Sequence, residues 1–576
     1  MNKDIKKYRE NSNQFNLEIK NLLNYYKNNK FDIAEQLSLQ MIEKFPDEQL
    51  VWKILSMIFL QTERVDKAID ANKKAVELNP KDFEAHNNLG MNLQQIGKFE
   101  DAIKCYEHAI KLNPKIPLIY YNLGNSLKEI DKLSQAELSY KQALSLKSDY
   151  VEVYLNLGNI YQKLGKLNDA EKSYKTAISF NPNFVEAHSN LGNLLQELDK
   201  RDEAEKHCKK AIELNPEYSE AYNNLGVTIQ DQGRLEEAEK NYKKAISLNP
   251  QHADAKFNLS LLLNLKGELV NGLKLYEWRL KKKIPTARLP EQKLVWDGKK
   301  PLLGKKFLVY EEQGIGDLIL FYRYLALLEK LGAEVTFKVK SILHKLFKNP
   351  KNKFKFIDKF PSDNKFDYES PLISLPYLFG TEVEKIPASK YYLKADSIKI
   401  NEWSEKLKSD NFKIGICWQG SKISINRSFP LSLFKKISMI PGIELISLHK
   451  GDGENQLVNI DFAVKHLGPN FDNNENAFID TSAVMMNCDL IITSDTVIPH
   501  LAGALGCPVW LVLNNMPYWP WMLKRKDSPW YPSMRLYRQN EINNWSSVFD
   551  KIKYDLEIIL NEKTRFKKDK IGNRTV

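Results

Sequence analysis

Apolar positions in the first half of the chain recur with a period of 34 residues, over about residues 17–284. In the unit at 219–250, Leu225 and Ile229 are four residues apart, as on one face of a helix, and Tyr242 continues the apolar stripe on a second helix. The 34-residue grid is marked by Pro46, Pro80, Pro114, Ser148, Pro182, Pro216 and Pro250. Because proline disfavours α geometry in the residue before it, each second helix is expected to end there. The pattern predicts about eight helix pairs that stack, since one pair cannot bury its apolar face alone.

The best-formed unit also carries small residues where its two helices would meet. Its order is an aromatic residue, two further positions, Leu-Gly, and then Gly, Ala, Tyr, Ala and Pro. Gly226 and Ala238 are small enough for the two helices to approach closely. This order is the tetratricopeptide signature, so the sequence predicts an α-solenoid that holds an extended polypeptide or a partner protein.

An asparagine recurs just before the leucine of the first helix in six of the repeats. These residues are Asn88, Asn122, Asn156, Asn190, Asn224 and Asn258. A carboxamide both donates and accepts hydrogen bonds, so a row of them suits the backbone of a peptide in the concave groove. Two alternatives remain: polar filler on the helix surface, or hydrogen bonds between adjacent repeats.

After about residue 285 short apolar strands alternate with helices, which predicts parallel sheets with helices on both faces. A second series of strands opens at FKIGICWQGS, so we expect an α/β region of two Rossmann-like lobes with a cleft between them. The predicted parts are an N-terminal extension (1–16), the solenoid (17–284), a linker (285–303), a first lobe (304–400), a second lobe (401–562) and a basic tail (563–576). Within them we expect a helix at about 317–331, a strand at SPLISL, and a final helix at about 546–560 that crosses back onto the first lobe.

The turn after the first strand of the first lobe contains Gly314, Gly316 and Asp317. An aspartate at the start of a helix is commonly an N-cap, and that role alone would explain it. The same carboxylate would lie at the C-terminal edge of a parallel sheet, where such folds bind ligands. There it could act as a general base on an acceptor hydroxyl.

A second candidate segment is Ser494-Asp495-Thr496, which ends an apolar strand and precedes a helix closed by Gly506. Free backbone N–H groups at the start of that helix would form an anion site. His500 lies one turn into the helix and would either face the ligand or pack as a buried histidine.

Composition narrows the classes of function. No apolar run approaches the length of a membrane span, and the N-terminus has no secretory signal, so we expect a cytoplasmic protein and leave peripheral contact with the inner membrane face open. Five scattered cysteines without CxxC spacing are expected to be reduced, and no His/Cys spacing predicts a metal site. The net charge of +12 is expected to reflect a solvated lysine-rich surface. The sequence has no arginine-rich patch interleaved with aromatic residues, which is the pattern that would predict nucleic-acid binding.

Four blocks occur in a specific order: GIGDLILFYRYL, IGICWQGSKISINRSFPLSLF, SDTVIPHLAGALGCPVW and DSPWYPSMRLYRQ. Together with the joining segment LYEWR…LVWDG, they resemble glycosyltransferase family nine, which includes bacterial heptosyltransferases. The likeness covers about residues 265–562. The repeat half also resembles the tetratricopeptide part of O-linked N-acetylglucosamine transferases.

The resemblance implies a metal-independent GT-B fold that uses a nucleoside-diphosphate sugar as co-substrate and no other cofactor. It implies Asp317 as the base and Ser494 to His500 as the diphosphate loop. Further donor-binding residues implied by the matching segments are Gln419, Gly420, Ser421, Arg427 and Lys450, with Lys422 as a weaker candidate. Trp519, Trp521, Trp530 and Tyr531 are expected to pack the lobe rather than stack on a base.

The sequence therefore predicts a glycosyltransferase whose solenoid presents an acceptor, either protein or surface glycan. The alternative is a non-catalytic tetratricopeptide scaffold with a degenerate nucleotide-sugar-binding domain. A nucleic-acid binder is a third possibility and predicts strongly salt-dependent binding of oligonucleotides.

Overall fold

A computed structural model describes residues 2–312, 314–348, 352–361, 365–420, 427–473, 476–541 and 544–572, with side chains between 14 and 561. The chain forms two compact units, Met1–Thr228 and Ile229–Val576, and each is described by itself.

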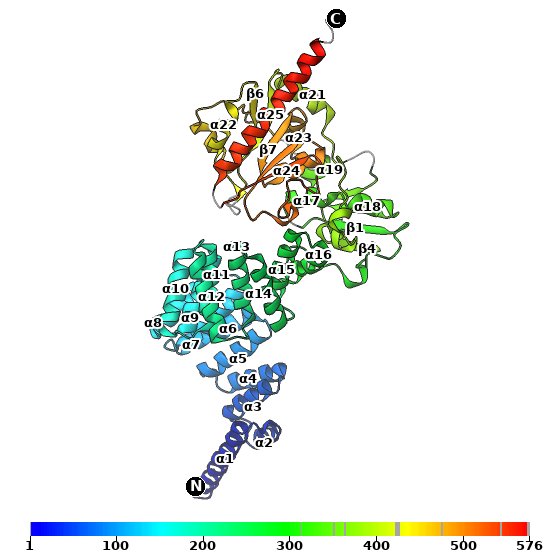
Figure 1. The fold of residues 1–576 in the computed structure, drawn as a ribbon. Helices are drawn as coiled ribbons and strands as arrows, with labels where there is room; N and C mark the ends of the chain where they lie inside the picture. The colour runs from blue at the N-terminus through cyan, green and yellow to red at the C-terminus, as the bar shows by residue number, and fades with distance from the viewer. Residues whose placement is uncertain are drawn as a thin grey trace. The chain divides into compact units, whose positions relative to one another are not determined.

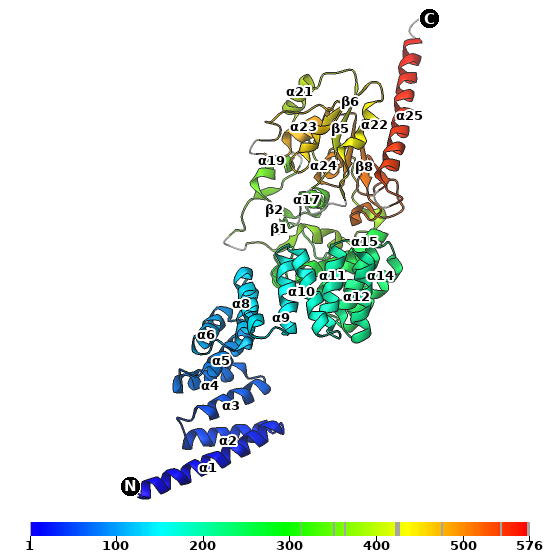
Figure 2. The ribbon, with the colours of Figure 1, turned by 90° about the vertical axis from the view of Figure 1, so that its left-hand side faces the viewer.

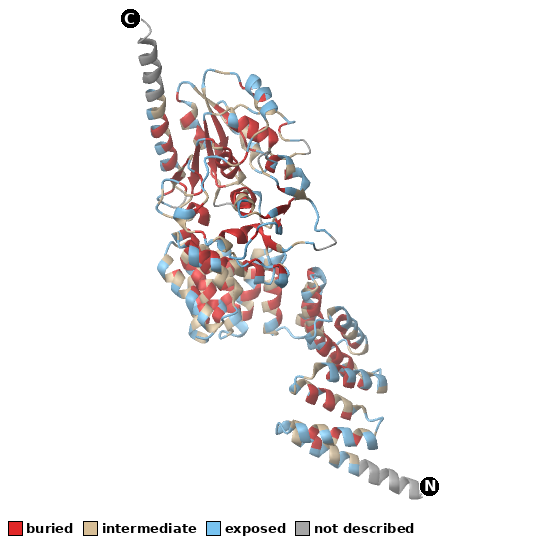
Figure 3. Cartoon of the chain, turned by 90° about the vertical axis from the view of Figure 1, so that its right-hand side faces the viewer, coloured by how far each residue is buried: buried red, intermediate tan, exposed pale blue. Residues whose placement is uncertain are grey.

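The first unit is built from antiparallel helix pairs (Figures 1 and 2). Its helices are α1 (Asn2–Lys27), α2 (Phe31–Lys44), α3 (Gln49–Gln61), α4 (Val65–Leu78), α5 (Phe83–Gln95), α6 (Phe99–Leu112), α7 (Pro117–Glu129), α8 (Leu133–Leu146), α9 (Val151–Lys163), α10 (Leu167–Phe180), α11 (Val185–Glu197), α12 (Arg201–Leu214) and α13 (Ser219–Asp231), the last of which runs into the second unit. Buried residues lie on the helix faces that meet, and exposed residues on the faces turned away from neighbouring helices (Figure 3). The helical solenoid predicted from the 34-residue period is therefore confirmed.

A glycine–tyrosine contact holds the two helices of a repeat close together. A Cβ atom added to Gly158 on α9 would lie 2.3 Å from Cε1 of Tyr174 on α10. The same contact would measure 2.5 Å between Gly124 and Tyr140. Real Cβ atoms do not come so close, so the absence of a side chain at these positions is what allows the ring to pack there.

Two more repeat helices and the whole α/β region form the second unit. It begins with α14 (Leu235–Leu248), α15 (Ala253–Lys266), α16 (Leu269–Tyr276) and the 3-10 segment η1 (Glu277–Lys281). Leu265, Leu269, Leu273 and Tyr276 from these last repeat helices belong to the same buried core as the α/β region. The end of the solenoid therefore folds together with the region that follows it.

The first sheet has the order β3-β2-β1-β4 and its strands pair in parallel. Its strands are β1 (Lys306–Tyr310), β2 (Glu334–Lys338), β3 (Lys355–Ile357) and β4 (Tyr368–Pro371). The helices between them are α17 (Ile315–Tyr322), α18 (Leu325–Lys330), α19 (His344–Phe347) and α20 (Leu375–Leu378). The predicted helix at 317–331 is thus two helices, and only the start of SPLISL is a strand, because Leu372–Ser374 turns as a 3-10 helix (η4).

The second sheet has the order β6-β5-β7-β8-β9, again parallel. Its strands are β5 (Phe412–Cys417), β6 (Ile443–Ser447), β7 (Leu490–Ser494), β8 (Val509–Leu513) and β9 (Met534–Arg538). Its helices are α21 (Ser397–Lys406), α22 (Lys435–Ser438), α23 (Ile479–Met486) and α24 (Val497–Leu505), with short 3-10 segments η7 (Leu431–Phe434) and η9 (Trp519–Trp521) between them.

The C-terminal helix α25 (Trp545–Gly572) packs on the second sheet, against α22, η7 and β9. Val548, Phe549, Ile552 and Leu556 enter the core that Trp418 and Phe434 share. The expectation that this helix crosses back onto the first lobe is therefore wrong, because its apolar face is already covered by the second. Of the basic tail predicted at 563–576, no side chain lies among the described ones. Among the described helices, none combines the length and the apolar character that a membrane crossing needs.

Candidate functional site

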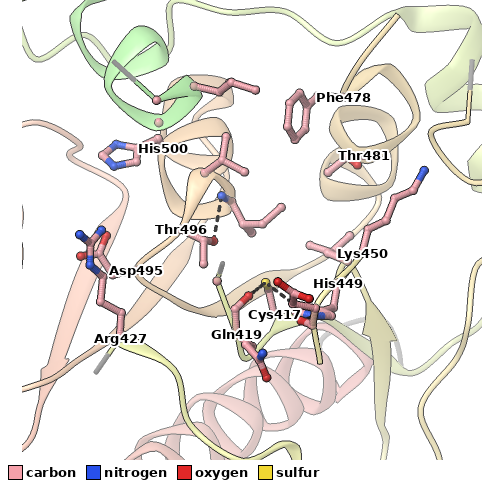
Figure 4. A pocket seen from close by; sticks show the side chains of 18 of the residues that line it. Cys417, Gln419, Arg427, His449, Lys450, Phe478, Thr481, Asp495, Thr496 and His500 are labelled. Carbon is pink, nitrogen blue, oxygen red and sulfur yellow. Dashed lines mark hydrogen bonds between the residues drawn. The ribbon is translucent and has the colours of Figure 1, made fainter. Parts of the chain in front are cut away.

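A cavity of about 710 Å³ opens in the second unit where the C-terminal ends of several strands meet (Figure 4). The turn after β1 and the start of α17 line it with Gly314, Gly316 and Asp317, and the ends of β5, β6 and β7 line it from the second sheet. Ligands bind at such edges in open α/β folds, because strand ends and helix starts converge there.

Asp317 is the third residue of α17, whose N-cap is Gly314. The N-cap role considered for Asp317 is therefore not the one it has, since the helix begins two residues before it. Its carboxylate oxygen Oδ1 instead accepts a hydrogen bond of 2.9 Å from the hydroxyl of Tyr518. Burial raises the pKa of Asp317 to about 7, against the opposing effect of the Tyr518 hydrogen bond, and the nearby Asp495 carboxyl raises it further.

The start of α24 faces the same cavity. Thr496 is the N-cap, and its hydroxyl oxygen accepts a hydrogen bond of 3.2 Å from the backbone N–H of Ile498. Figure 4 shows Arg427 beside Asp495, close to Thr496. Burial raises the pKa of Asp495 and the positive charge of Arg427 lowers it. The helix start and the guanidinium are both groups that can interact favourably with an anion.

His500 is buried one turn into α24. Its Nδ1 lies 3.0 Å from the hydroxyl of Tyr531, and its ring stacks on Trp521 at 4.8 Å. Burial lowers the pKa of His500 to about 3, and the charges of Arg323 and Arg427 add to that effect. The imidazole is therefore neutral at physiological pH and does not supply a positive charge to the cavity.

Gly316 packs directly against His500. A Cβ atom at Gly316 would lie 3.0 Å from Cδ2 of the imidazole. The glycine turn of the first sheet and the helix of the second sheet thus meet without an intervening side chain.

Lys450 lines the cavity, but its ammonium is directed to the loop that follows β6. It donates hydrogen bonds to the carbonyl oxygens of Phe471 and Asp472 at 2.9 Å and to Oδ1 of Asn473 at 2.6 Å. Gln419 and Gly420 also line the cavity, and Oε1 of Gln419 accepts a hydrogen bond of 3.1 Å from Gln456. Ser421 and Lys422 lie outside the described residues.

Several lining residues were not singled out from the sequence. Cys417 and His449 form a pair in the cavity wall, with 3.4 Å between Sγ and Nδ1, and Nε2 of His449 lies 2.7 Å from the carbonyl oxygen of Asp452. Tyr518 follows Asp317 by 201 residues in the sequence, and no local pattern connects the two. Phe478 also lines the cavity, in a left-handed conformation with φ of 63°.

The recurring asparagines make hydrogen bonds between neighbouring repeats. Asn122 donates to Oδ1 of Asn87 at 3.1 Å, Asn156 to Oδ1 of Asn125 at 3.2 Å, Asn190 to Oδ1 of Asn159 at 2.9 Å, and Asn224 to Oγ of Ser189 at 3.0 Å. Three of the four acceptors are themselves asparagines on the preceding first helix. The alternative of a bond between repeats is therefore present in the structure, while a role for Asn88, Asn122, Asn156, Asn190, Asn224 and Asn258 in holding a peptide stays a prediction.

Trp519, Trp521, Trp530 and Tyr531 are buried in the core between the sheets, as expected of packing residues. All five cysteines are free thiols. Within the described part of the chain, no three His, Cys, Asp or Glu side chains are grouped so that they could hold a metal ion.

Comparison with known proteins assigns the repeats. Profiles described as "TPR repeat" match residues 93–131, 124–165 and 158–199, and profiles described as "Tetratricopeptide repeat" match 21–83, 71–104, 184–251 and 228–278. Protein FlbA of Caulobacter vibrioides is 26% identical over 311 residues, which cover 49% of this chain and 51% of FlbA. The chain thus spans about half the length of that relative.

Solved tetratricopeptide structures resemble parts of the chain. The crystal structure of MamA is 30% identical, with a TM-score of 0.27, and covers 28% of this chain and 95% of its own. YrrB, a TPR protein with an unusual peptide-binding site, is 27% identical with a TM-score of 0.28, and covers 32% of this chain and 96% of its own. A tetratricopeptide repeat protein from Parabacteroides merdae is 18% identical with a TM-score of 0.38, covering 43% and 98%. Taken with the profile matches, the helix pairs of the first half identify it as an array of tetratricopeptide repeats, a scaffold of the kind that supports protein binding.

Proposed function

We propose that the chain is a glycosyltransferase, which moves a sugar from a nucleoside-diphosphate sugar to an acceptor presented by the repeat array. The proposal is carried by the combination of groups that line one cavity. It brings a carboxyl group with a pKa of about 7, that of Asp317, into the same space as the start of α24 and the guanidinium of Arg427. A base poised near neutral pH and an anion site are the two groups that such a transfer needs.

In this proposal Asp317 accepts the proton of the acceptor hydroxyl as its oxygen attacks the anomeric carbon. The bond from that carbon to the diphosphate breaks, and the leaving group carries its negative charge toward the N–H groups at the start of α24. Arg427 and the hydroxyl of Thr496 add to the stabilisation of that charge, which is an electrostatic contribution. His500 is neutral and could only donate or accept a hydrogen bond there.

The ordered sequence blocks support the same proposal. The residues from Gly314 to Asp317 and those from Asp495 to Ile498, with His500, come from different sheets, yet both groups line the cavity. Ser494 is buried at the end of β7 and does not line it. Because these blocks resemble glycosyltransferase family nine, we propose that the two parallel sheets form a GT-B arrangement and that the reaction is metal-independent. The repeat array is proposed to hold the acceptor because tetratricopeptide grooves bind extended polypeptides.

The test is release of nucleoside diphosphate from a panel of nucleotide sugars, with and without candidate acceptors. We expect one donor to be turned over, with activity lost as the pH falls through about 7, because Asp317 must be deprotonated to act as a base. Asp317→Asn should lower turnover by roughly 10²–10⁴-fold while leaving nucleotide binding within a few-fold. Tight nucleotide binding without release from any donor would instead favour the non-catalytic scaffold.

A further inference from the structure

Tyrosine recurs at one position of the second helix in four repeats, and its hydroxyl always bonds within the same repeat. The pairs are Tyr106 with Gln94 at 2.9 Å, Tyr140 with Asn125 at 2.6 Å, Tyr174 with Asn159 at 2.7 Å, and Tyr242 with Gln230 at 3.0 Å. In each pair the acceptor is a carboxamide oxygen on the first helix. The bond satisfies a buried phenol and holds the two helices in register.

The last repeat breaks this rule. Tyr276 on α16 stands 34 residues after Tyr242, and Asn264 on α15 stands 34 residues after Gln230. The side-chain oxygen and nitrogen of Asn264 are buried, and neither has a hydrogen-bond partner among the described residues. Tyr276, which is 2% exposed, hydrogen-bonds to Tyr518 instead. The tyrosine of the last repeat is thus directed out of the solenoid and into the α/β region.

Tyr518 connects that tyrosine to the cavity. Its hydroxyl hydrogen is donated to Oδ1 of Asp317 at 2.9 Å, so its oxygen is the atom left to accept from Tyr276. The three groups form a chain in which the Tyr276 hydroxyl donates to Tyr518, and Tyr518 donates to the carboxylate. Hydrogen bonds in such a chain polarise one another, so the first strengthens the second.

A second link joins the same end of the solenoid to the same loop. Arg279 in η1 has no exposed side-chain surface and donates to both carboxylate oxygens of Glu312 at 2.8 Å. Glu312 lies between β1 and the Gly314 turn, and its Oε1 also accepts from the backbone N–H of Ile373. Ser374 Oγ, at 2.9 Å from Arg279, bonds onward to Glu277. The loop that leads from β1 to α17, the helix of Asp317, is therefore bonded to Arg279 of the YEWR segment at Glu312, and Glu277 accepts hydrogen bonds from Arg279 and Ser374.

We propose that the last tetratricopeptide repeat is part of the candidate site, with Tyr276 and Arg279 as positioning residues that set the pose and the proton affinity of Asp317. This inference rests on the proposed function for the catalytic role of Asp317. The hydrogen bonds that link Tyr276, Tyr518 and Asp317 do not depend on that function. The YEWR segment, residues 276–279, then has two roles: it ends the repeat array, and it orients the carboxyl group of Asp317.

The charged and titratable groups around Asp317 give the direction of the effect. Burial raises its pKa, the hydrogen bond from Tyr518 lowers it, Asp495 raises it, Arg427 lowers it and Glu312 raises it. Removing the Tyr518 hydroxyl therefore raises the pKa of Asp317 above about 7. Removing the Tyr276 hydroxyl acts in the same direction through Tyr518 and has the smaller effect.

The experiment is an infrared titration of the full-length protein, in which the Asp317 carboxyl band is assigned by its loss in Asp317→Asn. We expect Tyr518→Phe to move the titration midpoint up by about one pH unit, and Tyr276→Phe by about half of that. Tyr242→Phe is the matched control, because the Tyr242 hydroxyl has the same repeat position but donates to Gln230 within its own repeat. It should leave the midpoint unchanged.

Transfer activity is measured on the same variants, and its acidic limb should move with the infrared midpoint. Arg279→Lys should lower kcat more than it changes KM for the donor, because a lysine keeps the charge but cannot make the two-pronged bond to Glu312. A midpoint that is the same in wild type, Tyr518→Phe and Tyr276→Phe, in proteins with native thermal unfolding, would overturn the inference. Absence of transfer from every donor would overturn the proposed function alone, since the infrared result does not depend on turnover.

Discussion

Asp317 is the residue on which the account of the cavity depends, and its environment is costly to the folded protein. An aspartate whose pKa is raised to about 7 is bound to a proton in the folded state over a pH range in which the unfolded chain has lost it. The neutral form suits its buried surroundings, whereas the charged form that accepts a proton does not. A destabilised carboxylate at a ligand site is a common trade of stability for reactivity.

The stability of Asp317→Asn should therefore depend on pH relative to wild type. The contribution of Asp317 is fully present below its unfolded pKa of about 3.9 and is lost as the pH rises through about 7. Chemical unfolding at pH 8 should find the variant more stable by up to about 4 kcal/mol, and at about pH 3, below the unfolded pKa, the two should agree. Asp396→Asn is the control of opposite sign, because Lys345 and the start of α21 hold the pKa of Asp396 low, so that variant loses stability at pH 8. A difference for Asp317→Asn that is the same at both pH values would contradict the assigned pKa.

At the scale of elements, the repeat helices were predictable and the contacts of the site were not. The helix pairs follow from a local pattern that recurs in every unit, so Leu225 and Tyr242 indicate their faces from sequence spacing alone. The turn at Gly314 and the start of α24 were also found, because strand ends and helix caps have local signals. Tyr518 was not found because its bond to Asp317 depends on how two sheets pack, and Lys450 was placed on the cavity without its bonds to the 471–473 loop.

The close contact between Gly158 and Tyr174 predicts that a side chain at Gly158 lowers the stability of the protein. In Gly158→Ala the added Cβ atom would meet the ring of Tyr174 at 2.3 Å, so helix α9 or the ring must move. We expect a loss of about 1–3 kcal/mol in the free energy of unfolding, although alanine is the better helix former. Lys172→Ala, at an exposed position of α10, should change stability by less than about 0.5 kcal/mol. A Gly158→Ala protein as stable as wild type would show that the two helices are not in close contact.

The bonds between repeats give the asparagines a structural role that can be measured. Asn190→Ala removes the 2.9 Å hydrogen bond to Oδ1 of Asn159, which keeps its hydrogen bond from the Tyr174 hydroxyl. We expect thermal unfolding to show a loss of about 1 kcal/mol. Asn190→Ser/Asn159→Ser, which retains polar groups of smaller size, is a suitable second variant. Unchanged stability, together with weaker binding of a peptide, would assign Asn190 to the groove instead.

At the scale of the whole chain, the division into compact units does not fall at the linker predicted from the sequence. The last repeat helices share a core with the α/β region, and the split occurs near Thr228 and Ile229. The sequence placed the end of the solenoid near residue 284 because the 34-residue period ends there. The sequence period indicates where the helical repeats end. It does not indicate that the last repeat helices pack on the apolar surface of the α/β region.

Truncation tests whether the α/β region needs the last repeat helices in order to fold. A fragment of residues 233–576 keeps Leu269, Leu273 and Tyr276 and should unfold cooperatively with a native-like melting temperature. A fragment of residues 285–576 exposes the surface that they cover and should be aggregated or loosely packed, as judged by dye binding and near-ultraviolet circular dichroism. Equal stability of the two fragments would show that the α/β region does not need the last repeat.

The most direct test of the central claim, that the cavity around Asp317 transfers a sugar, is the mass of an acceptor after incubation with the donor that the protein turns over. Mass spectrometry should find an increase of one sugar residue with wild-type protein, and none within the same time with Asp317→Asn, which should still bind the nucleotide. An acceptor modified equally by both proteins would contradict the role of Asp317. A donor bound by the wild type, with no acceptor modified and no diphosphate released, would contradict the transfer itself.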